Sequence, residues 1–188
     1  THPCPVITVQ DLEVGKGTKT TLSCNVSPIG GQLNIVWKSG DQLVKKQEGL
    51  VPDEGTFAAD SQTATLQITF PTTCETFTCE VTSPNYPKEA ERFKRVNIFV
   101  YEVEVAEAEV RAGTPTNISC LISHVQSEGV TVLWREGSIT VTQEVETSSV
   151  KDGQQISTLK IENPKSDMIY TCLLTSIRYP ASTAYLKK

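Results

Sequence analysis

Apolar and polar residues alternate along several short stretches of this 188-residue chain. In residues 20–26, Leu22, Cys24 and Val26 fall on one side and polar residues fall on the other. A period of two is typical of strands with one buried face, whereas a helix needs a period of 3.6, which no window sustains. The pattern therefore predicts an all-β protein. The same alternation is found in residues 64–68, 102–105 and 158–161.

Glycine, proline, aspartate and asparagine gather between these alternating runs. These residues favour turns, because glycine and asparagine tolerate positive φ and proline fixes φ near the value that a turn needs. We therefore expect turns that separate the strands at residues 30–31, 52–55, 84–85 and 152–153.

The chain repeats itself. Residues 13–24 return as residues 109–120, each stretch beginning with glutamate and ending with cysteine. Three further matches follow in the same order at a nearly constant offset, which indicates two copies of one unit of about 95 residues. We predict two domains, residues 1–100 and 101–188. The further matches are 36–40 with 133–137, 65–68 with 158–161, and 79–87 with 172–180.

Composition places the chain among globular proteins and excludes several functions. Hydrophobic residues make up 38% and charged residues 21% of the chain, which sets aside collagen-like, coiled-coil and disordered classes. The net charge of −5 argues against nucleic-acid binding, because domains that bind nucleic acid carry a basic surface. No run approaches the ~18 consecutive apolar residues of a membrane helix, so we expect no direct membrane insertion of this stretch.

Cysteine usage indicates an oxidising compartment. The chain has six cysteines, no Cys-x-x-Cys pair and only two histidines, which argues against a zinc site and favours disulfides. The sequons Asn25-Val26-Ser27 and Asn117-Ile118-Ser119 point the same way. Because Cys24 and Cys120 point inward, Asn25 and Asn117 point outward, and we expect both to carry glycans.

The spacing of cysteine, tryptophan and tyrosine resembles that of the immunoglobulin superfamily over essentially the whole chain. In the first unit Cys24 precedes Trp37 by 13 residues and Cys79 by 55. In the second unit the corresponding residues are Cys120, Trp134 and Cys172, with Tyr170 two positions before the last cysteine.

This resemblance implies two tandem immunoglobulin-like β-sandwiches of about seven strands each. It also implies the disulfides Cys24–Cys79 and Cys120–Cys172, each packed against its own tryptophan, Trp37 or Trp134. The first unit departs from the pattern at Phe77, which stands two residues before Cys79 where the second unit has Tyr170. The family uses the hydroxyl of this tyrosine to hold a corner of the chain, so in the first unit packing must hold it. The segment between the domains, residues 92–103, contains no Gly, Pro or Ser. We therefore expect the domains to lie end to end.

Catalytic and metal chemistry find little support in the sequence. His2 lies near the start and His124 lies in a predicted loop, so a Ser-His-Asp or Cys-His site is not expected. Glu102, Glu104, Glu107 and Glu109 alternate with other residues, as on a solvated strand face. We predict a non-enzymatic protein without metal or cofactor.

The resemblance implies extracellular recognition, in a cell-surface or secreted protein of adhesion, receptor or immune type that binds a protein or glycan partner. In the first unit the candidate partner-binding residues are Ile29 in one loop, and Asn85 and Tyr86 in another. Tyr86-Pro87 recurs at Tyr179-Pro180, which favours a structural role for Tyr86. Two alternatives stay open: an antibody-type constant region, and a structural spacer from a longer array of such repeats.

Cys4 and Cys74 have no cysteine counterparts in the second copy. Regular geometry places them at opposite ends of the sandwich, whereas parity favours pairing. We predict a Cys4–Cys74 bridge, formed because the N-terminal segment bypasses the first strand position. The alternative is an intermolecular disulfide, which would give a homodimer.

Overall fold

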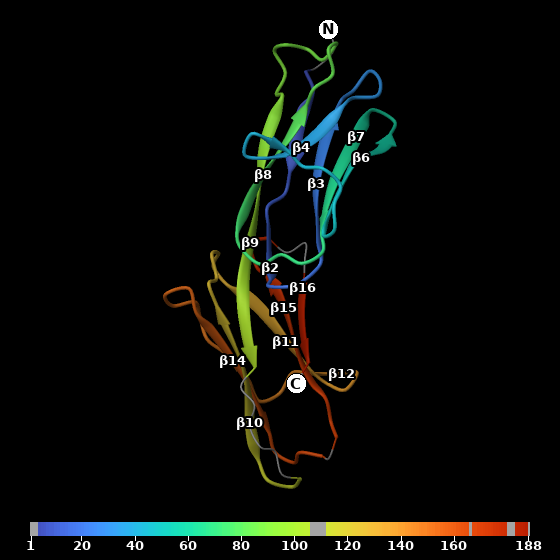
Figure 1. Ribbon diagram of the computed structural model, residues 1–188. Coiled ribbons are helices and arrows are strands. Elements are labelled where there is room, and N and C mark those ends of the chain that lie inside the picture. Colours follow the sequence, from blue (N-terminus) through green and yellow to red (C-terminus); the bar gives the residue numbers. More distant parts are fainter. Residues whose placement is uncertain (1–3, 106–111, 166, 180–182, 188) are drawn as a thin grey trace. The chain divides into compact units, whose positions relative to one another are not determined.

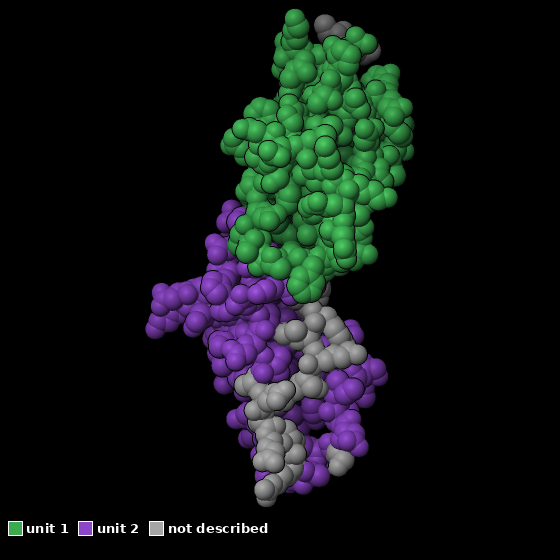
Figure 2. Space-filling model, in the orientation of Figure 1, with its two compact units in different colours: residues 1–12, 19–98 green, residues 13–18, 99–188 purple. Residues whose placement is uncertain are grey.

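A computed structural model describes residues 4–105, 112–165, 167–179 and 183–187, with side chains up to residue 179. All regular structure in these ranges is β-strand. The chain divides into two compact units, which Figure 2 colours separately. Unit 1 comprises residues 1–12 and 19–98, and unit 2 comprises residues 13–18 and 99–188. The boundary expected after residue 100 lies inside strand β9 (Phe93–Val105), which contributes residues to both units.

The first sheet of unit 1 contains strand β3 (Thr20–Ser27) (Figure 1). The buried and exposed residues of β3 alternate as the sequence predicts. Leu22, Cys24 and Val26 are fully buried, whereas Thr21 and Ser23 are exposed. The strand order is β1-β3-β7-β6, with every neighbouring pair antiparallel. The other strands of this sheet are β1 (Val6–Val9), β6 (Leu50–Ala58) and β7 (Ser61–Ile68).

The second sheet of unit 1 packs its apolar face toward the first. The Cys24–Cys79 disulfide joins the two sheets, and Trp37, only 1% exposed, lies opposite Cys79 in the strand register. Phe77 is also buried, so packing holds the corner where a tyrosine hydroxyl is missing. The strands of this sheet are β4 (Ile35–Ser39), β5 (Gln42–Leu43), β8 (Glu75–Val81) and the first part of β9.

Unit 2 repeats this arrangement. One sheet has the order β13-β14-β10-β9, with the later residues of β9 at its edge, and the other has the order β12-β11-β15-β16 (Figure 1). The strands are β10 (Thr116–Ser123), β11 (Val130–Glu136), β12 (Ile139–Val141), β13 (Val145–Thr147), β14 (Gln155–Ile161), β15 (Tyr170–Ser176) and β16 (Thr183–Lys187).

The core of unit 2 is centred on the Cys120–Cys172 disulfide. Trp134 lies opposite Cys172 in register, and its indole Nε1 donates a hydrogen bond to Ser157 Oγ at 2.9 Å. The Tyr170 hydroxyl donates to a side chain, the Glu136 carboxylate at 3.3 Å. Two packed antiparallel sheets, joined by a disulfide beside a buried tryptophan, make each unit an immunoglobulin-like β-sandwich.

Strand β2 (Leu12–Gly15) runs from one unit into the other along the chain. It pairs with β9, and the backbone N–H of Lys16 donates to the carbonyl of Tyr101 at 2.8 Å. Tyr101 itself is fully buried in the core of unit 2. These contacts place residues 13–18 in unit 2, although the sequence repeat had assigned them to the first domain.

The turn predicted at residues 52–55 is wrong. Pro52 and its neighbours belong to the continuous strand β6, which carries a bulge between Asp53 and Thr56. Gly55 allows this bulge, because its φ is +124° and a Cβ there would lie 1.8 Å from the carbonyl oxygen of Thr63. A bulge accommodates the extra residue without ending the strand.

The predicted Cys4–Cys74 bridge is also wrong, since Cys4 has a free, exposed thiol. The prediction required the N-terminal segment to bypass the first strand position, but β1 occupies it, with Val6 paired to Ser27. Cys4 therefore lies near Ser27, whereas Cys74 precedes β8, toward the Thr20 end of β3. At ~3.3 Å per residue those ends lie about 23 Å apart, beyond the ~7 Å that a disulfide spans.

The end-to-end arrangement of the two units stays a prediction. Of the four glutamates predicted to lie on a solvated strand face, Glu107 and Glu109 lie outside the described residues. Glu102 and Glu104 are exposed, whereas Val103 and Val105 between them are half-buried against the core of unit 2. This alternation is that of a solvated strand face.

Candidate functional site

Two loops of unit 1 enclose a pocket of about 730 Å³. One loop joins β3 to β4 and the other joins β8 to β9, as in the loop clusters at the end of an immunoglobulin-like sandwich. The pocket brings together Ile29, Asn85 and Tyr86, the three residues selected from the sequence. Its lining residues are Pro5, Pro28, Ile29, Gly30, Gly31, Gln32, Leu33, Ser83, Pro84, Asn85, Tyr86 and Pro87.

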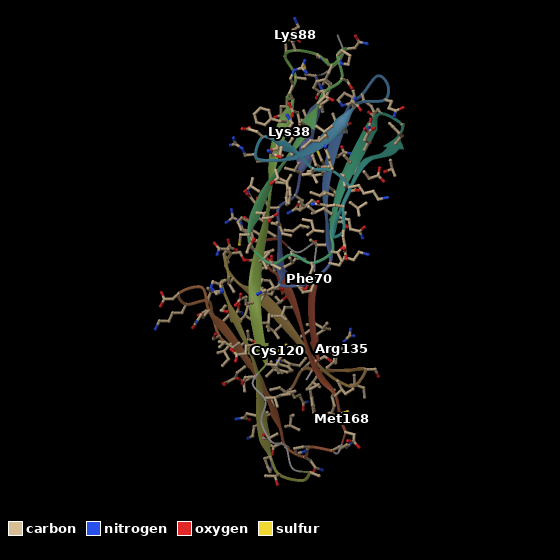
Figure 3. The ribbon with its side chains drawn as sticks, in the orientation of Figure 1. Lys38, Phe70, Lys88, Cys120, Arg135 and Met168 are labelled. Carbon is tan, nitrogen blue, oxygen red and sulfur yellow. A yellow bond between two sulfur atoms is a disulfide. The ribbon has the colours of Figure 1, made fainter. Side chains whose placement is uncertain are left out.

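The pocket wall is uncharged. Prolines, aliphatic residues and an aromatic ring form most of it, and the polar groups come from Gln32, Ser83, Asn85 and the backbone of two glycines. Lys88, the first charged residue after the lining segment, is exposed (Figure 3). Such a wall suits a ligand that places apolar groups against it and forms a few directed hydrogen bonds.

The β3–β4 loop is held in place by a buried glutamine of β7. Gln62 is fully buried, and its side chain accepts from the N–H of Leu33 at 2.8 Å and donates to the Leu33 carbonyl at 3.0 Å. It also donates to the carbonyl of Glu54 at 2.9 Å. The loop is further fixed by the N–H of Ile29, which donates to the carbonyl of Asp60 at 2.8 Å.

Ser83 connects the two loops. Its hydroxyl accepts a hydrogen bond from the N–H of Asn34 at 2.6 Å, and the serine lies at the base of the pocket wall with little exposed surface. Because a hydroxyl both donates and accepts, Ser83 can still donate one hydrogen bond toward the pocket.

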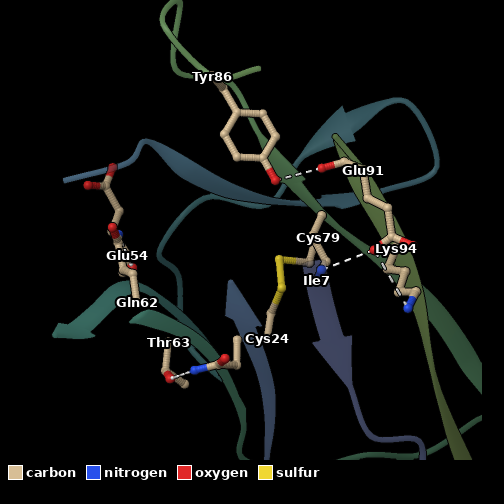
Figure 4. Close-up of a disulfide and its surroundings, with 10 residues drawn as sticks. Ile7, Cys24, Glu54, Gln62, Thr63, Cys79, Tyr86, Glu91 and Lys94 are labelled. Carbon is tan, nitrogen blue, oxygen red and sulfur yellow. Dashed lines mark hydrogen bonds and ion pairs between the residues drawn. A yellow bond between two sulfur atoms is a disulfide. The ribbon is translucent and has the colours of Figure 1, made fainter. Parts of the chain in front are cut away.

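Tyr86 is a lining residue of the pocket, not a projecting anchor, and its side chain points toward Glu91 (Figure 4). Only 4% of the residue is exposed, and its hydroxyl donates to the carbonyl of Glu91 at 2.8 Å. The guanidinium of Arg92 lies over the ring at 5.7 Å and donates to the Tyr86 carbonyl at 3.3 Å. Burial, with the nearby charge of Glu91, raises the pKa of Tyr86. Asn85, by contrast, is exposed.

Both sequon asparagines lie on outward-facing positions of their strands. Asn117 is exposed. Asn25 is half-buried, and its amide Nδ2 donates to the Thr63 hydroxyl at 2.8 Å across the sheet. Glycosylation at the two sites stays a prediction.

Sequence reasoning missed the buried glutamines. Gln155 of unit 2 repeats the contacts of Gln62, donating to the Val130 carbonyl at 2.9 Å and accepting from its N–H at 3.0 Å. Gln62 and Gln155 stand three residues before the matched positions 65 and 158. Recurrence of the same polar residue in both copies is the signal that would have revealed them.

A second missed residue is Glu13, whose side chain is fully buried in unit 2. Its carboxylate accepts hydrogen bonds from the N–H groups of Gln126 at 2.8 Å and Ser127 at 3.3 Å. It also accepts from the hydroxyls of Ser127 and Ser176, the latter at 2.9 Å. Four donors from two loops therefore compensate one buried charge.

The hydroxyl of Tyr101 is buried close to this carboxylate. Among the described residues it has no hydrogen-bond partner. Burial, with the charge of Glu13, raises the pKa of Tyr101 strongly. A neutral phenol is therefore maintained beside the buried carboxylate.

Within the described ranges, no cluster of three or more His, Cys, Asp or Glu is placed to hold a metal ion. The same ranges contain no helix long and apolar enough to cross a membrane.

Comparison with known proteins returns structures only: no family model and no curated protein sequence matches the chain. A titin fragment of domains I67–I69 in an E-to-A mutated variant is 15% identical, with a TM-score of 0.43. The chain is covered completely in that alignment but spans only 65% of the fragment. A structure entitled "Anomalous substructure of Titin-A168169" is 11% identical over 98% of this chain and 97% of that one, with a TM-score of 0.44.

The titin domains z1z2 in complex with telethonin are 16% identical over 99% of this chain and 96% of that one, with a TM-score of 0.40. At these identities and scores the similarities carry no functional argument. The immunoglobulin-like fold rests on the strand order, the inter-sheet disulfides and the buried tryptophans of each unit.

Proposed function

We propose that this chain is a non-catalytic recognition module that binds another macromolecule through the two pocket-forming loops of unit 1. The observation that carries the proposal is the pocket itself: an uncharged cavity of about 730 Å³ whose two loops are held by part-buried hydrogen bonds from Gln62 and Ser83. A loop pocket that is held in shape before binding loses little conformational entropy when a ligand enters.

We further propose an extracellular location, in a cell-surface or secreted protein. Each unit contains a disulfide between its two sheets, and disulfides persist in oxidising compartments. The outward position of Asn117 is compatible with glycan attachment in the secretory pathway.

The test is a binding screen with the glycosylated chain against arrays of cell-surface proteins and glycans. For any partner found, Asn85→Arg should weaken binding at least tenfold, because it places a long charged side chain at the rim of the uncharged pocket. Thr72→Arg is the matched control, since Thr72 is exposed on the loop before β8, away from the pocket. Equal binding by both variants would place recognition elsewhere and overturn the proposal.

A structural spacer from a longer array of repeats is the second candidate, favoured by the four ordered matches between the two copies. A spacer predicts that no partner in the screen depends on the pocket. It also predicts that Asn85→Arg and Thr72→Arg leave every interaction of the chain unchanged.

A further inference from the structure

Unit 2 contains an occupied counterpart of the open pocket in unit 1. The internal repeat relates Gly30 and Gly31 to Gln126 and Ser127, at the offset that relates Cys24 to Cys120. The loop contacts agree: the N–H of Ile29 donates to Asp60, and its counterpart, the N–H of Val125, donates to Gly153 at 2.9 Å. The two loops are therefore equivalent at these positions.

The remaining positions correspond in the same way. Ser83, two residues after β8, corresponds to Ser176 at the end of β15, at the offset that relates Cys79 to Cys172. Pro5 corresponds to Tyr101, because Val9 and Val105 pair with equivalent cysteines. Pro5 and Ser83 both line the open pocket of unit 1.

In unit 2 these positions hold an extended segment that presents a carboxylate. Glu13 accepts from Gln126, Ser127 and Ser176, and three residues further on Lys16 donates to the carbonyl of Tyr101. The segment Leu12–Gly15 forms strand β2, in which every residue is buried.

In unit 1 the corresponding residues line an open cavity. Gly30, Gly31 and Ser83 all line it. The N–H groups of the two glycines donate to no acceptor in the described part of the chain, and the Ser83 hydroxyl has one proton left to donate. No acidic side chain lines the pocket, so nothing there repels a carboxylate.

We propose that the pocket of unit 1 binds an extended peptide segment of a partner protein that presents a glutamate or aspartate, as residues 13–15 of strand β2 do in unit 2. The proposal rests on the proposed function and names its ligand chemistry. Backbone amides and a hydroxyl form short, charge-assisted hydrogen bonds to a carboxylate. The apolar part of the pocket wall, including Tyr86, lies in the same cavity as these donors.

The probe is the peptide acetyl-Asp-Leu-Glu-Val-Gly-Lys-amide, which has the sequence of residues 11–16. It is titrated into the ¹⁵N-labelled, disulfide-intact full chain, and amide shifts are followed by NMR. We expect the largest shifts at Gly30 and Gly31. The same peptide with Glu13→Gln should bind at least tenfold more weakly, because its hydrogen bonds lose their charge assistance.

Position 31 provides matched variants. A Cβ added at Gly31 meets no atom within 4 Å, so substitutions there leave the loop intact. Gly31→Ser adds the hydroxyl that Ser127 supplies in unit 2 and should tighten peptide binding about fivefold. Gly31→Asp places a like charge beside the peptide carboxylate and should weaken binding more than tenfold. Thr72→Asp, with the same charge change on another loop, should bind as the unsubstituted chain does.

The outcomes separate this inference from the proposed function. Equal affinity of the glutamate and glutamine peptides overturns the carboxylate site, as does normal peptide binding by Gly31→Asp. If a partner from the screen depends on Asn85 but no acidic peptide binds, the pocket function stands and the inference fails. If neither the peptide nor any partner depends on the pocket, both fail.

Discussion

Replacing Glu13 by alanine removes the one buried acceptor that four donors of unit 2 share. Hydrogen bonds to a charged group contribute about 1.5–3 kcal/mol each, but bonds that share one carboxylate are not additive. Losing the acceptor leaves the part-buried N–H groups of Gln126 and Ser127 without their carboxylate partner. We therefore expect Glu13→Ala to lower the free energy of unfolding of unit 2 by about 3–5 kcal/mol.

Glu13→Gln provides a milder test that keeps the shape of the side chain. One amide oxygen still accepts, and the new NH₂ group can donate to the hydroxyl of Ser127 or Ser176. We expect a loss of about 1–2 kcal/mol. Glu146→Ala is the control, because Glu146 is exposed on β13 of the same unit and its removal changes the net charge equally.

Urea denaturation followed by fluorescence, together with amide hydrogen exchange by NMR, measures these effects. In the unsubstituted chain the amides of Gln126 and Ser127 should exchange slowly, and in Glu13→Ala they should exchange rapidly. The reasoning is refuted if Glu13→Ala costs less than about 1 kcal/mol or no more than Glu146→Ala. Continued protection of both amides in Glu13→Ala would contradict it equally.

Three further predictions concern buried polar groups and the N-terminal thiol. Gln155→Leu leaves the buried backbone N–H and carbonyl of Val130 without their side-chain partner, and Gln62→Leu does the same to the part-buried groups of Leu33. Each substitution should lower the free energy of unfolding by about 2–3 kcal/mol, measured by denaturation. A loss below the error of the measurement would show that the buried glutamine does not stabilise its unit. Tyr101→Phe should be neutral or stabilising, because it deletes a buried hydroxyl with no partner in the described ranges. The raised pKa of Tyr101 contributes stability that is present below about pH 10 and is lost as pH rises further, by up to ~1.4 kcal/mol per pH unit. Tyr101→Phe should reduce the loss of unfolding free energy at alkaline pH. If the dependence of unfolding free energy on pH is unchanged in this variant, Tyr101 is not the group responsible. Cys4 should react with a thiol reagent in the native, unreduced chain, and a Cys4–Cys74 peptide in non-reducing mapping would contradict the structure.

Local pattern was enough to predict most of the framework. The alternation of Leu22, Cys24 and Val26 predicted which side of β3 is buried, because side-chain direction in a strand depends only on position along that strand. The repeat and the spacing of cysteine and tryptophan, through the resemblance they carry, led to two sandwiches with the disulfide pairs that the structure contains. The loops that form the pocket were also identified from sequence.

The burial of polar side chains was decided by tertiary structure. Gln62 and Gln155 read as ordinary polar strand residues until the backbone of Leu33 or Val130 is brought beside them. The bulge at Gly55 likewise depends on the carbonyl of a neighbouring strand. Alternation with Ala64 and Leu66 places Gln62 on the inward side of β7, but the local sequence does not show which backbone groups of other segments meet it there.

Glu13 shows most clearly why the burial of a polar side chain depends on the tertiary structure. In sequence it is one glutamate between Leu12 and Val14, and exposure is the ordinary expectation for a glutamate. In the structure its partners lie 113, 114 and 163 residues away, and they alone make its burial favourable. Strand periodicity is encoded within a few residues, whereas a buried charge requires donors from segments that only the folded chain brings together.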